Sequence, residues 1–160
     1  ALAAKIKKAC VHSIVKISPE KYNALYRKIG NLNKLLAWGH ARVIENLLEK
    51  NECGVAISDK FGDERFLKKA LMERGKKIRL VQAIRAESDT AVAAASVLAR
   101  AEFLRTLKKL SADIGYKLPK GATHVETAAK EIIAMHGKGA LPMVAKMHFK
   151  ITKRIIDRDK

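Results

Sequence analysis

The stretch Ile78–Arg100, IRLVQAIRAESDTAVAAASVLAR, contains the clearest change of secondary structure in the chain. Its first part, Ile78–Arg85, is rich in aliphatic side chains and predicts a strand. The strand leads to Asp89, and an alanine-rich segment then predicts a long helix over Thr90–Ala112. A strand that leads through an acidic residue into a helix is typical of an α/β domain.

Two more strands are predicted on the N-terminal side of this stretch. Gly54–Ser58, GVAIS, is a short apolar strand that ends at Asp59, and the β-branched residues of Val11–Ile17 predict another strand. Three strands are few for a stable sheet.

Helices account for most of the remaining chain. Ser18 and Pro19 begin a helix that Gly30 ends, and Asn31 or Asn33 begins the next helix, which runs to Lys50. Further helices are predicted over Ala1–Ala9, Asp63–Gly75, Thr123–His136 and Leu141–Ile156. The order of elements therefore favours a layered α/β or α+β domain.

The length and composition exclude several classes of protein. A chain of 160 residues with 48% hydrophobic and 31% charged residues suits one folded domain. No apolar run approaches the roughly 20 residues that a membrane-spanning helix needs. Cys10 and Cys53 are the only cysteines, which excludes a disulfide scaffold and a CxxC zinc site. Reduced thiols predict an intracellular, cytoplasmic protein.

The chain is strongly basic, with 33 Lys and Arg against 16 Asp and Glu and a net charge of +17. This charge suits a polyanionic partner, either nucleic acid or an anionic membrane surface, although surplus lysine can also serve solubility. Residues 51–100 hold ten basic and seven acidic side chains, a larger acidic share than either flank. A basic chain with carboxylates gathered in its middle resembles what is expected of a metal-dependent nuclease.

Asp59 and Asp89 are the strongest candidates for a metal site, because each follows an apolar strand. In open α/β sheets, functional sites gather at the carboxyl ends of the strands. Carboxylate oxygens suit Mg²⁺, and two such ions can stabilise the attacking and leaving oxygens of a phosphodiester displacement. The competing interpretation is a turn residue or, for Asp89, a helix N-cap.

Other acidic residues and motifs carry less information. Asp63 and Glu64 are expected to cap a helix, whereas Glu87 suits a metal site or a solvated loop. The five histidines form no i, i+4 zinc pair, and no P-loop or Rossmann glycine motif is present. Aromatic residues make up 5% of the chain, which counts against a binder of single strands built on stacking platforms.

Several motifs resemble one known family in its order. AESDTAVAAASVLARAEFL (Ala86–Leu104) resembles the AAAS-x-LAR signature of the type 2 ribonucleases H, with its preceding aspartate. The segment Ser18–Leu48 resembles the P-x-x-YN-x-LY and NLN-x-LLAWGHA motifs of ribonuclease HIII in particular. LPKGATHV (Leu118–Val125) and AKMHFK (Ala145–Lys150) resemble the same family.

The resemblance implies an α/β RNase H-like fold, with a mixed sheet flanked by helices. It also implies an endoribonuclease that cleaves the RNA strand of RNA/DNA hybrids and leaves 3′-hydroxyl and 5′-phosphate ends. The family holds two Mg²⁺ or Mn²⁺ ions with four carboxylates, in the order Asp-Glu, Asp, Asp. Asp59 matches the third and Asp89 the fourth, so both are expected to be catalytic metal ligands.

The sequence departs from the family pattern at its beginning. Nothing in Ala1–Ile17 matches the first Asp-Glu pair or its glycine-rich motif. Residues 1–160 are therefore expected to be an N-terminally truncated catalytic domain, with a sheet edge and an apolar face uncovered.

The expected partner is an RNA/DNA hybrid. We expect a monomer with neither a membrane partner nor a small-molecule cofactor. The alternative function is a non-catalytic, basic nucleic-acid-binding module of the same fold.

Overall fold

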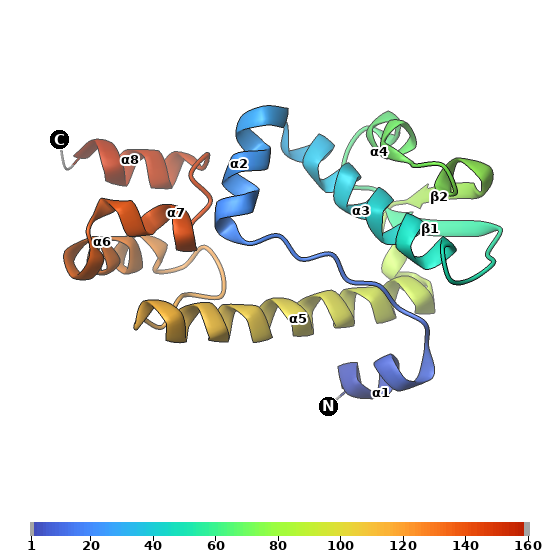
Figure 1. Ribbon diagram of the computed structural model, residues 1–160, viewed down its shortest axis with the longest axis horizontal. Coiled ribbons are helices and arrows are strands. Elements are labelled where there is room, and N and C mark those ends of the chain that lie inside the picture. The colour runs from blue at the N-terminus through green and yellow to red at the C-terminus, as the bar shows by residue number, and fades with distance from the viewer. Residues whose placement is uncertain (1, 159–160) are drawn as a thin grey trace. The chain divides into compact units, whose positions relative to one another are not determined.

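A computed structural model describes residues 2–158 of the chain. These residues form two compact units (Figure 1). Unit 1 contains the residues up to Lys16 together with Ile29–Ala101, and unit 2 contains Ile17–Lys28 and the residues from Glu102 onward. Unit 1 carries the strands, and unit 2 is helical.

The sheet of unit 1 has two parallel strands, β1 (Val55–Asp59) and β2 (Arg79–Ala83). Parallel neighbours cannot be joined by a tight turn, so a crossover segment is needed. Here the crossover contains helix α4 (Glu64–Ala70) and the short 3-10 helix η1 (Gly75–Lys77). The predicted strands at Gly54–Ser58 and Ile78–Arg85 are confirmed with slightly shifted ends, whereas the predicted helix Asp63–Gly75 ends early, at Ala70.

Helix α3 (Leu32–Leu48) packs against α4 to form the core of unit 1. The buried residues of this core are Ala37, Ala41, Leu67 and Leu71. Alanines on α3 allow close approach, because the distance between two helix axes depends on the side chains at their contact. Leu80 of β2 packs against the same cluster, whereas Val55 and Ile57 on β1 are exposed.

The predicted helix starts are confirmed at two places. Helix α2 (Pro19–Ile29) begins after Ser18, whose hydroxyl accepts a backbone N–H of the first turn, and Gly30 follows its end with a φ of 65°. Asn31 is the N-cap of α3, and its side-chain oxygen accepts the Lys34 N–H at 3.1 Å. These caps satisfy backbone donors that have no partner within the helix.

Glu45 on α3 fixes the turn that precedes β2. Its buried carboxylate accepts the backbone N–H group of Arg74 and that of Gly75, each at 3.0 Å. The same carboxylate forms an ion pair with the Arg74 guanidinium. Burial alone would raise the pKa of Glu45, but these hydrogen bonds and the Arg74 charge outweigh burial and lower that pKa. Glu45 therefore ties the crossover to α3 in its ionised form.

Unit 2 is built from helices around a second core. Helix α5 (Thr90–Ile114) begins in unit 1 and continues into unit 2. It is followed by α6 (Val125–His136), η3 (Lys138–Ala140), α7 (Leu141–Val144) and α8 (Lys150–Arg158). The buried core residues are Ile114, Leu118, Ile132, Ala140 and Leu141.

The prediction of one helix over Leu141–Ile156 is wrong, because the chain breaks between α7 and α8. The break is held by Asn23 of α2, which is buried. Its amide group donates to the carbonyls of Pro142 and Ala145 at 3.1 and 2.9 Å, and its oxygen accepts the Met147 N–H at 2.9 Å. These bonds replace backbone bonds that an uninterrupted helix would have made.

The predicted strand at Val11–Ile17 is also wrong. These residues lie outside any helix or strand, after the short helix α1 (Leu2–Ala9). β-branched residues favour an extended backbone, but a strand exists only where a neighbouring chain pairs with it. In the described part of the chain, the only paired strands are β1 and β2.

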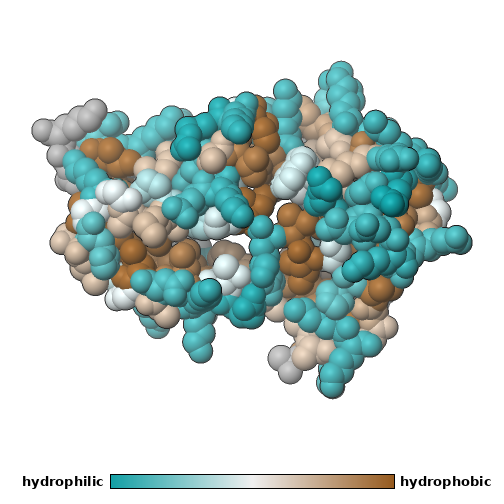
Figure 2. Space-filling view, viewed as in Figure 1, coloured by the Kyte–Doolittle hydropathy of each residue, from teal (hydrophilic) through white to brown (hydrophobic). Residues whose placement is uncertain are grey.

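Hydrophilic side chains cover much of the visible face, with smaller hydrophobic patches between them (Figure 2). Among residues 2–158, no helix combines the length and apolar character needed to cross a bilayer.

Candidate functional site

The parallel register of the sheet brings the ends of β1 and β2 together. Asp59, the last residue of β1, lies opposite Ala83, the last residue of β2. The Lys60 N–H then donates to the Ala83 carbonyl at 2.9 Å, which extends the pairing one step beyond the strands. Asp59 is therefore held at the carboxyl edge of the sheet, where α/β proteins commonly place functional groups.

Asp59 and Asp89 are both hydrogen-bonded to one residue, Ala86. The Ala86 N–H donates to Asp59 Oδ1 at 3.2 Å, and the Asp89 N–H donates to the Ala86 carbonyl at 2.9 Å. Ala86 is buried and begins the short 3-10 helix η2 (Ala86–Ser88). The structure thus brings the two predicted site residues to the same turn.

Asp89 also caps helix α5. Its Oδ1 accepts the backbone N–H groups of Ala91 and Val92, at 2.8 and 3.3 Å. The N-cap interpretation of Asp89 is therefore confirmed, and this role leaves Oδ2 available. Among the described residues, neither Asp89 Oδ2 nor Asp59 Oδ2 accepts a hydrogen bond, so each aspartate keeps a carboxylate oxygen that could bind a cation.

The turn between β2 and η2 contains a strained residue. Arg85 has a φ of 55° and a ψ of 43°, a left-handed conformation that non-glycine residues adopt uncommonly. It follows Ile84, whose side chain is exposed, and precedes the buried Ala86. The left-handed backbone therefore redirects the chain between the strand and the turn that holds both aspartates.

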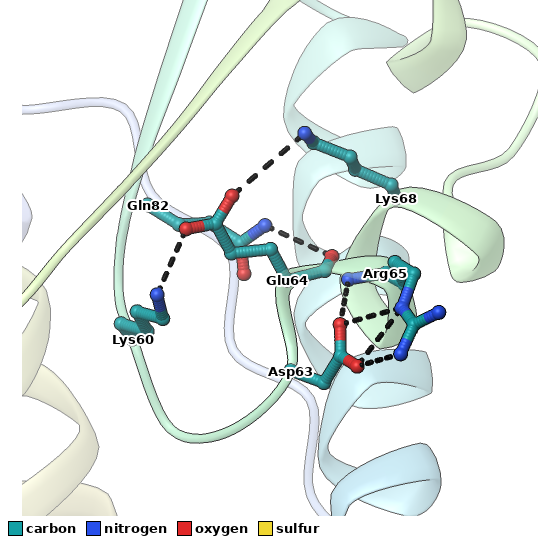
Figure 3. Close-up of polar contacts among 6 residues, drawn as sticks. All are labelled: Lys60, Asp63, Glu64, Arg65, Lys68 and Gln82. Carbon is teal, nitrogen blue, oxygen red and sulfur yellow. Dashed lines mark hydrogen bonds and ion pairs between the residues drawn. The ribbon is translucent and has the colours of Figure 1, made fainter.

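The neighbouring acids Asp63 and Glu64 are engaged elsewhere (Figure 3). Asp63 is the N-cap of α4, and three hydrogen bonds from the Arg65 side chain are the main cause that lowers its pKa to about 2. Glu64 pairs with Lys60 at 3.0 Å and with Lys68 at 3.8 Å. The expectation that both residues serve the start of a helix is confirmed, and their carboxylates are paired with cations of their own segment.

Glu87 lies in η2, and its side chain is exposed. Exposure leaves open both interpretations of Glu87, a metal ligand and a solvated residue.

His40 is a neighbour of this site that the sequence did not indicate. Its Nδ1 lies 3.3 Å from Ser58 Oγ, next to Asp59 in the chain, and its ring packs against Phe61 at 4.8 Å. Burial lowers the pKa of His40, and the charge of Asp59 opposes that effect. His40 and Ser58 are 18 residues apart, a separation that no local sequence repeat connects. Their contact is therefore seen only in the structure, where α3 packs on the sheet.

The carboxylates of Asp59 and Asp89 are suitable metal ligands, but two carboxylates alone are not a complete metal site. Within residues 2–158, no group of three or more His, Cys, Asp and Glu side chains is arranged to hold a metal ion. Asp59 and Asp89 supply two carboxylates with unused oxygens, which is a common protein contribution to a Mg²⁺ site. These unused carboxylate oxygens are of the ligand type that a hard divalent cation prefers.

Comparisons with known proteins point to one family. A model of the family described as ribonuclease HII matches residues 1–152. Ribonuclease HIII of Protochlamydia amoebophila is 44% identical over 158 residues, which is 98% of this chain and 52% of the relative. Ribonuclease HIII of Chlamydia pneumoniae is 47% identical over 152 residues, or 93% of this chain and 51% of the relative. The chain thus spans about half the length of the curated relatives it matches.

Solved structures agree with these relatives. The crystal structure of a glutamine-to-alanine mutant of Bst-RNase HIII has a TM-score of 0.86 at 30% identity, over 99% of this chain and 54% of that one. The structure of Bst-RNase HIII in complex with Mn²⁺ has a TM-score of 0.79 at 32% identity, over 89% and 49%. The predicted α/β RNase H-like fold is therefore confirmed, although the sheet within residues 2–158 is parallel and not mixed.

Proposed function

Because this chain belongs to the ribonuclease HII family, we propose that the whole protein is an endoribonuclease. It hydrolyses phosphodiester bonds in the RNA strand of RNA/DNA hybrids, in a reaction that depends on divalent metal ions. The observation that carries this proposal is the match of the family over residues 1–152, joined to relatives named ribonuclease HIII at 43–47% identity.

Asp59 and Asp89 are the proposed catalytic, metal-binding residues of this chain. The support is geometric: both are fixed to Ala86, and each keeps Oδ2 free of hydrogen bonds among the described residues. The Asp89 cap leaves its carboxylate few orientations, because two N–H groups of α5 hold Oδ1 in place. Such preorganisation lowers the cost of assembling the site when a cation binds.

The proposed metal is Mg²⁺ or Mn²⁺, in a two-ion site. A bound divalent cation supplies charge stabilisation for the phosphate and lowers the pKa of a bound water. The two aspartates would hold such ions through their Oδ2 atoms, because their Oδ1 atoms accept backbone N–H groups. The similar crystal structure with Mn²⁺ supports the metal class, and the Asp-Glu pair implied by the resemblance would complete the donor set.

The charge of the chain supports a nucleic-acid substrate. A net charge of +17 favours contact with the phosphate backbone, which positions a substrate without reading its sequence. A monomeric state and a cytoplasmic location are parts of the same proposal. Cys10 and Cys53 are exposed free thiols, which suits a reducing compartment.

The test of the site uses the whole protein and a labelled RNA/DNA hybrid, in Mg²⁺ and then in Mn²⁺. Asp59→Asn and Asp89→Asn should each lower kcat/KM by at least about 100-fold, because each removes a charged metal ligand. Asn still caps a helix, so Asp89→Asn keeps α5 intact. Asp63→Asn is the matched control, since Asp63 is a nearby cap paired with Arg65, and it should leave cleavage within about 2-fold.

Mn²⁺ titration of the same variants separates the two parts of the proposal. Weaker Mn²⁺ binding by Asp59→Asn and Asp89→Asn than by the wild type supports the metal site. Cleavage of the hybrid by the wild type supports the activity. Unchanged cleavage in both variants would exclude these residues as catalytic ligands. Salt-sensitive hybrid binding without cleavage in either metal would contradict the nuclease and favour the binding module.

A further inference from the structure

A column of aromatic rings lies in unit 2, assembled from two distant parts of the chain. Tyr26 of α2 stacks on His148 with 3.9 Å between ring centroids and 22° between planes. Phe149 lies 4.2 Å from His148, and Tyr22 lies 5.6 Å from it. These four residues, with Lys146, are called the aromatic cluster.

The backbone under the aromatic cluster is fixed. Asn23 lies between the two tyrosines in sequence and binds the backbone of Pro142, Ala145 and Met147 through three hydrogen bonds. The segment that carries His148 and Phe149 is therefore tied to α2. A rigid ring surface binds a flat ligand with little loss of conformational freedom.

The four rings differ in their exposure to solvent. Tyr22 is only 5% exposed and is the most buried residue of the aromatic cluster, whereas Tyr26 and His148 are half-buried. Phe149 is 44% exposed. The outer part of the column therefore offers aromatic surface to a partner.

Two lysines, Lys146 and Lys153, lie close to the rings of the aromatic cluster. Lys146 Nζ lies 4.7 Å from the Tyr22 ring centroid and 6.0 Å from that of Phe149. Burial lowers the pKa of His148, and the charges of Lys146 and Lys153 lower it further, which keeps its ring neutral at neutral pH. The segment of residues 146–154, KMHFKITKR, holds four Lys and Arg and no acidic residue.

We propose that the aromatic cluster is a docking surface for single-stranded nucleic acid, which stacks an unpaired base against Phe149 and places its phosphates near Lys146 and Lys153. A duplex hides the faces of its bases within its own stack, so only an unpaired stretch offers a base face to an exposed ring. The combination of stacking rings with nearby cations is the one that single-strand binders use. Binding of single-stranded nucleic acid to this surface does not depend on the proposed cleavage activity.

The test measures binding of the 160-residue chain to a fluorescent oligothymidylate of about 12 nucleotides, a length within the usual site sizes. An abasic oligomer with the same number of phosphates isolates the contribution of the bases. The wild type should bind the oligothymidylate more tightly than the abasic oligomer. Phe149→Ala should weaken oligothymidylate binding about 10-fold, toward the abasic level, and leave abasic binding unchanged.

Two further variants keep the result interpretable. Phe103→Ala is the matched control, because Phe103 is 43% exposed and lies outside the aromatic cluster, and it should change nothing. Phe149→Trp retains a ring and should retain binding, with Trp fluorescence quenched by oligothymidylate and not by the abasic oligomer. Equal wild-type affinity for the two oligomers would overturn the proposal, as would a base preference that survives in a folded Phe149→Ala.

Discussion

Tyr22 combines a useful ring with an unsatisfied hydroxyl group. Its ring packs on Tyr26 and His148, but its hydroxyl is buried without a hydrogen-bond partner in the described structure. Burial, with a smaller effect from Tyr26, raises the pKa of Tyr22. A buried polar group without a partner destabilises the folded state by about 1–3 kcal/mol.

Tyr22→Phe should therefore leave the free energy of unfolding unchanged or raise it by about 1 kcal/mol, as measured by urea denaturation. A Tyr22→Phe variant less stable than the wild type would show that the Tyr22 hydroxyl has a stabilising partner.

At the scale of elements, Glu45 links α3 to the turn before β2. Its pKa is lowered in the folded state, so the folded protein holds the Glu45 proton less tightly than the unfolded chain does. Its contribution to stability is therefore complete above the ordinary glutamate pKa and is lost as pH falls through the lower, folded-state pKa.

Glu45→Gln should lower the free energy of unfolding at neutral pH, and the difference from wild type should shrink as the pH is lowered below the ordinary glutamate range. Urea denaturation at a series of pH values measures both effects. Glu49→Gln, at the C-cap of the same helix, is the control for a Glu-to-Gln change that leaves the hydrogen bonds to Arg74 and Gly75 in place. A constant deficit at every pH would mean that Glu45 acts through packing and not through its charge.

The sequence was most informative where local signals decide an element. Ser18, Gly30 and Asn31 mark helix ends through their own backbone and cap chemistry, and those ends are where the structure has them. The break between α7 and α8 depends on Asn23, more than a hundred residues earlier, so the local pattern predicted a continuous helix. The aromatic cluster also joins residues more than a hundred positions apart, so local patterns could not predict it. The low average aromatic content of the chain gave no sign that these rings lie together.

The candidate site was predictable in part. The alternation of apolar strands and aspartates placed Asp59 and Asp89 at strand ends, and the structure joins both to Ala86. Their role as metal ligands stays a prediction. The contact between His40 and Ser58 arises from helix packing on the sheet, which no motif in the sequence encodes.

At the scale of the whole molecule, the net charge of +17 should govern the proposed binding to nucleic acid. Each phosphate contact releases condensed counterions, so affinity falls linearly with salt on logarithmic axes. With about six contacts, affinity for a hybrid should fall about 10³-fold between about 50 and 200 mM salt. Fluorescence anisotropy with a labelled hybrid measures this slope. An affinity that is flat across this range would show that charge does not drive the association.

Ala86 makes the two candidate aspartates mechanically dependent on each other. Its N–H holds the side chain of one and its carbonyl holds the backbone of the other, so a shift of this peptide moves both carboxylates together. Their spacing is therefore set by the path of the main chain through residues 85–89. An engineer who wishes to retune that spacing, for a larger or smaller cation, therefore has to reshape this turn as well as the end of β1.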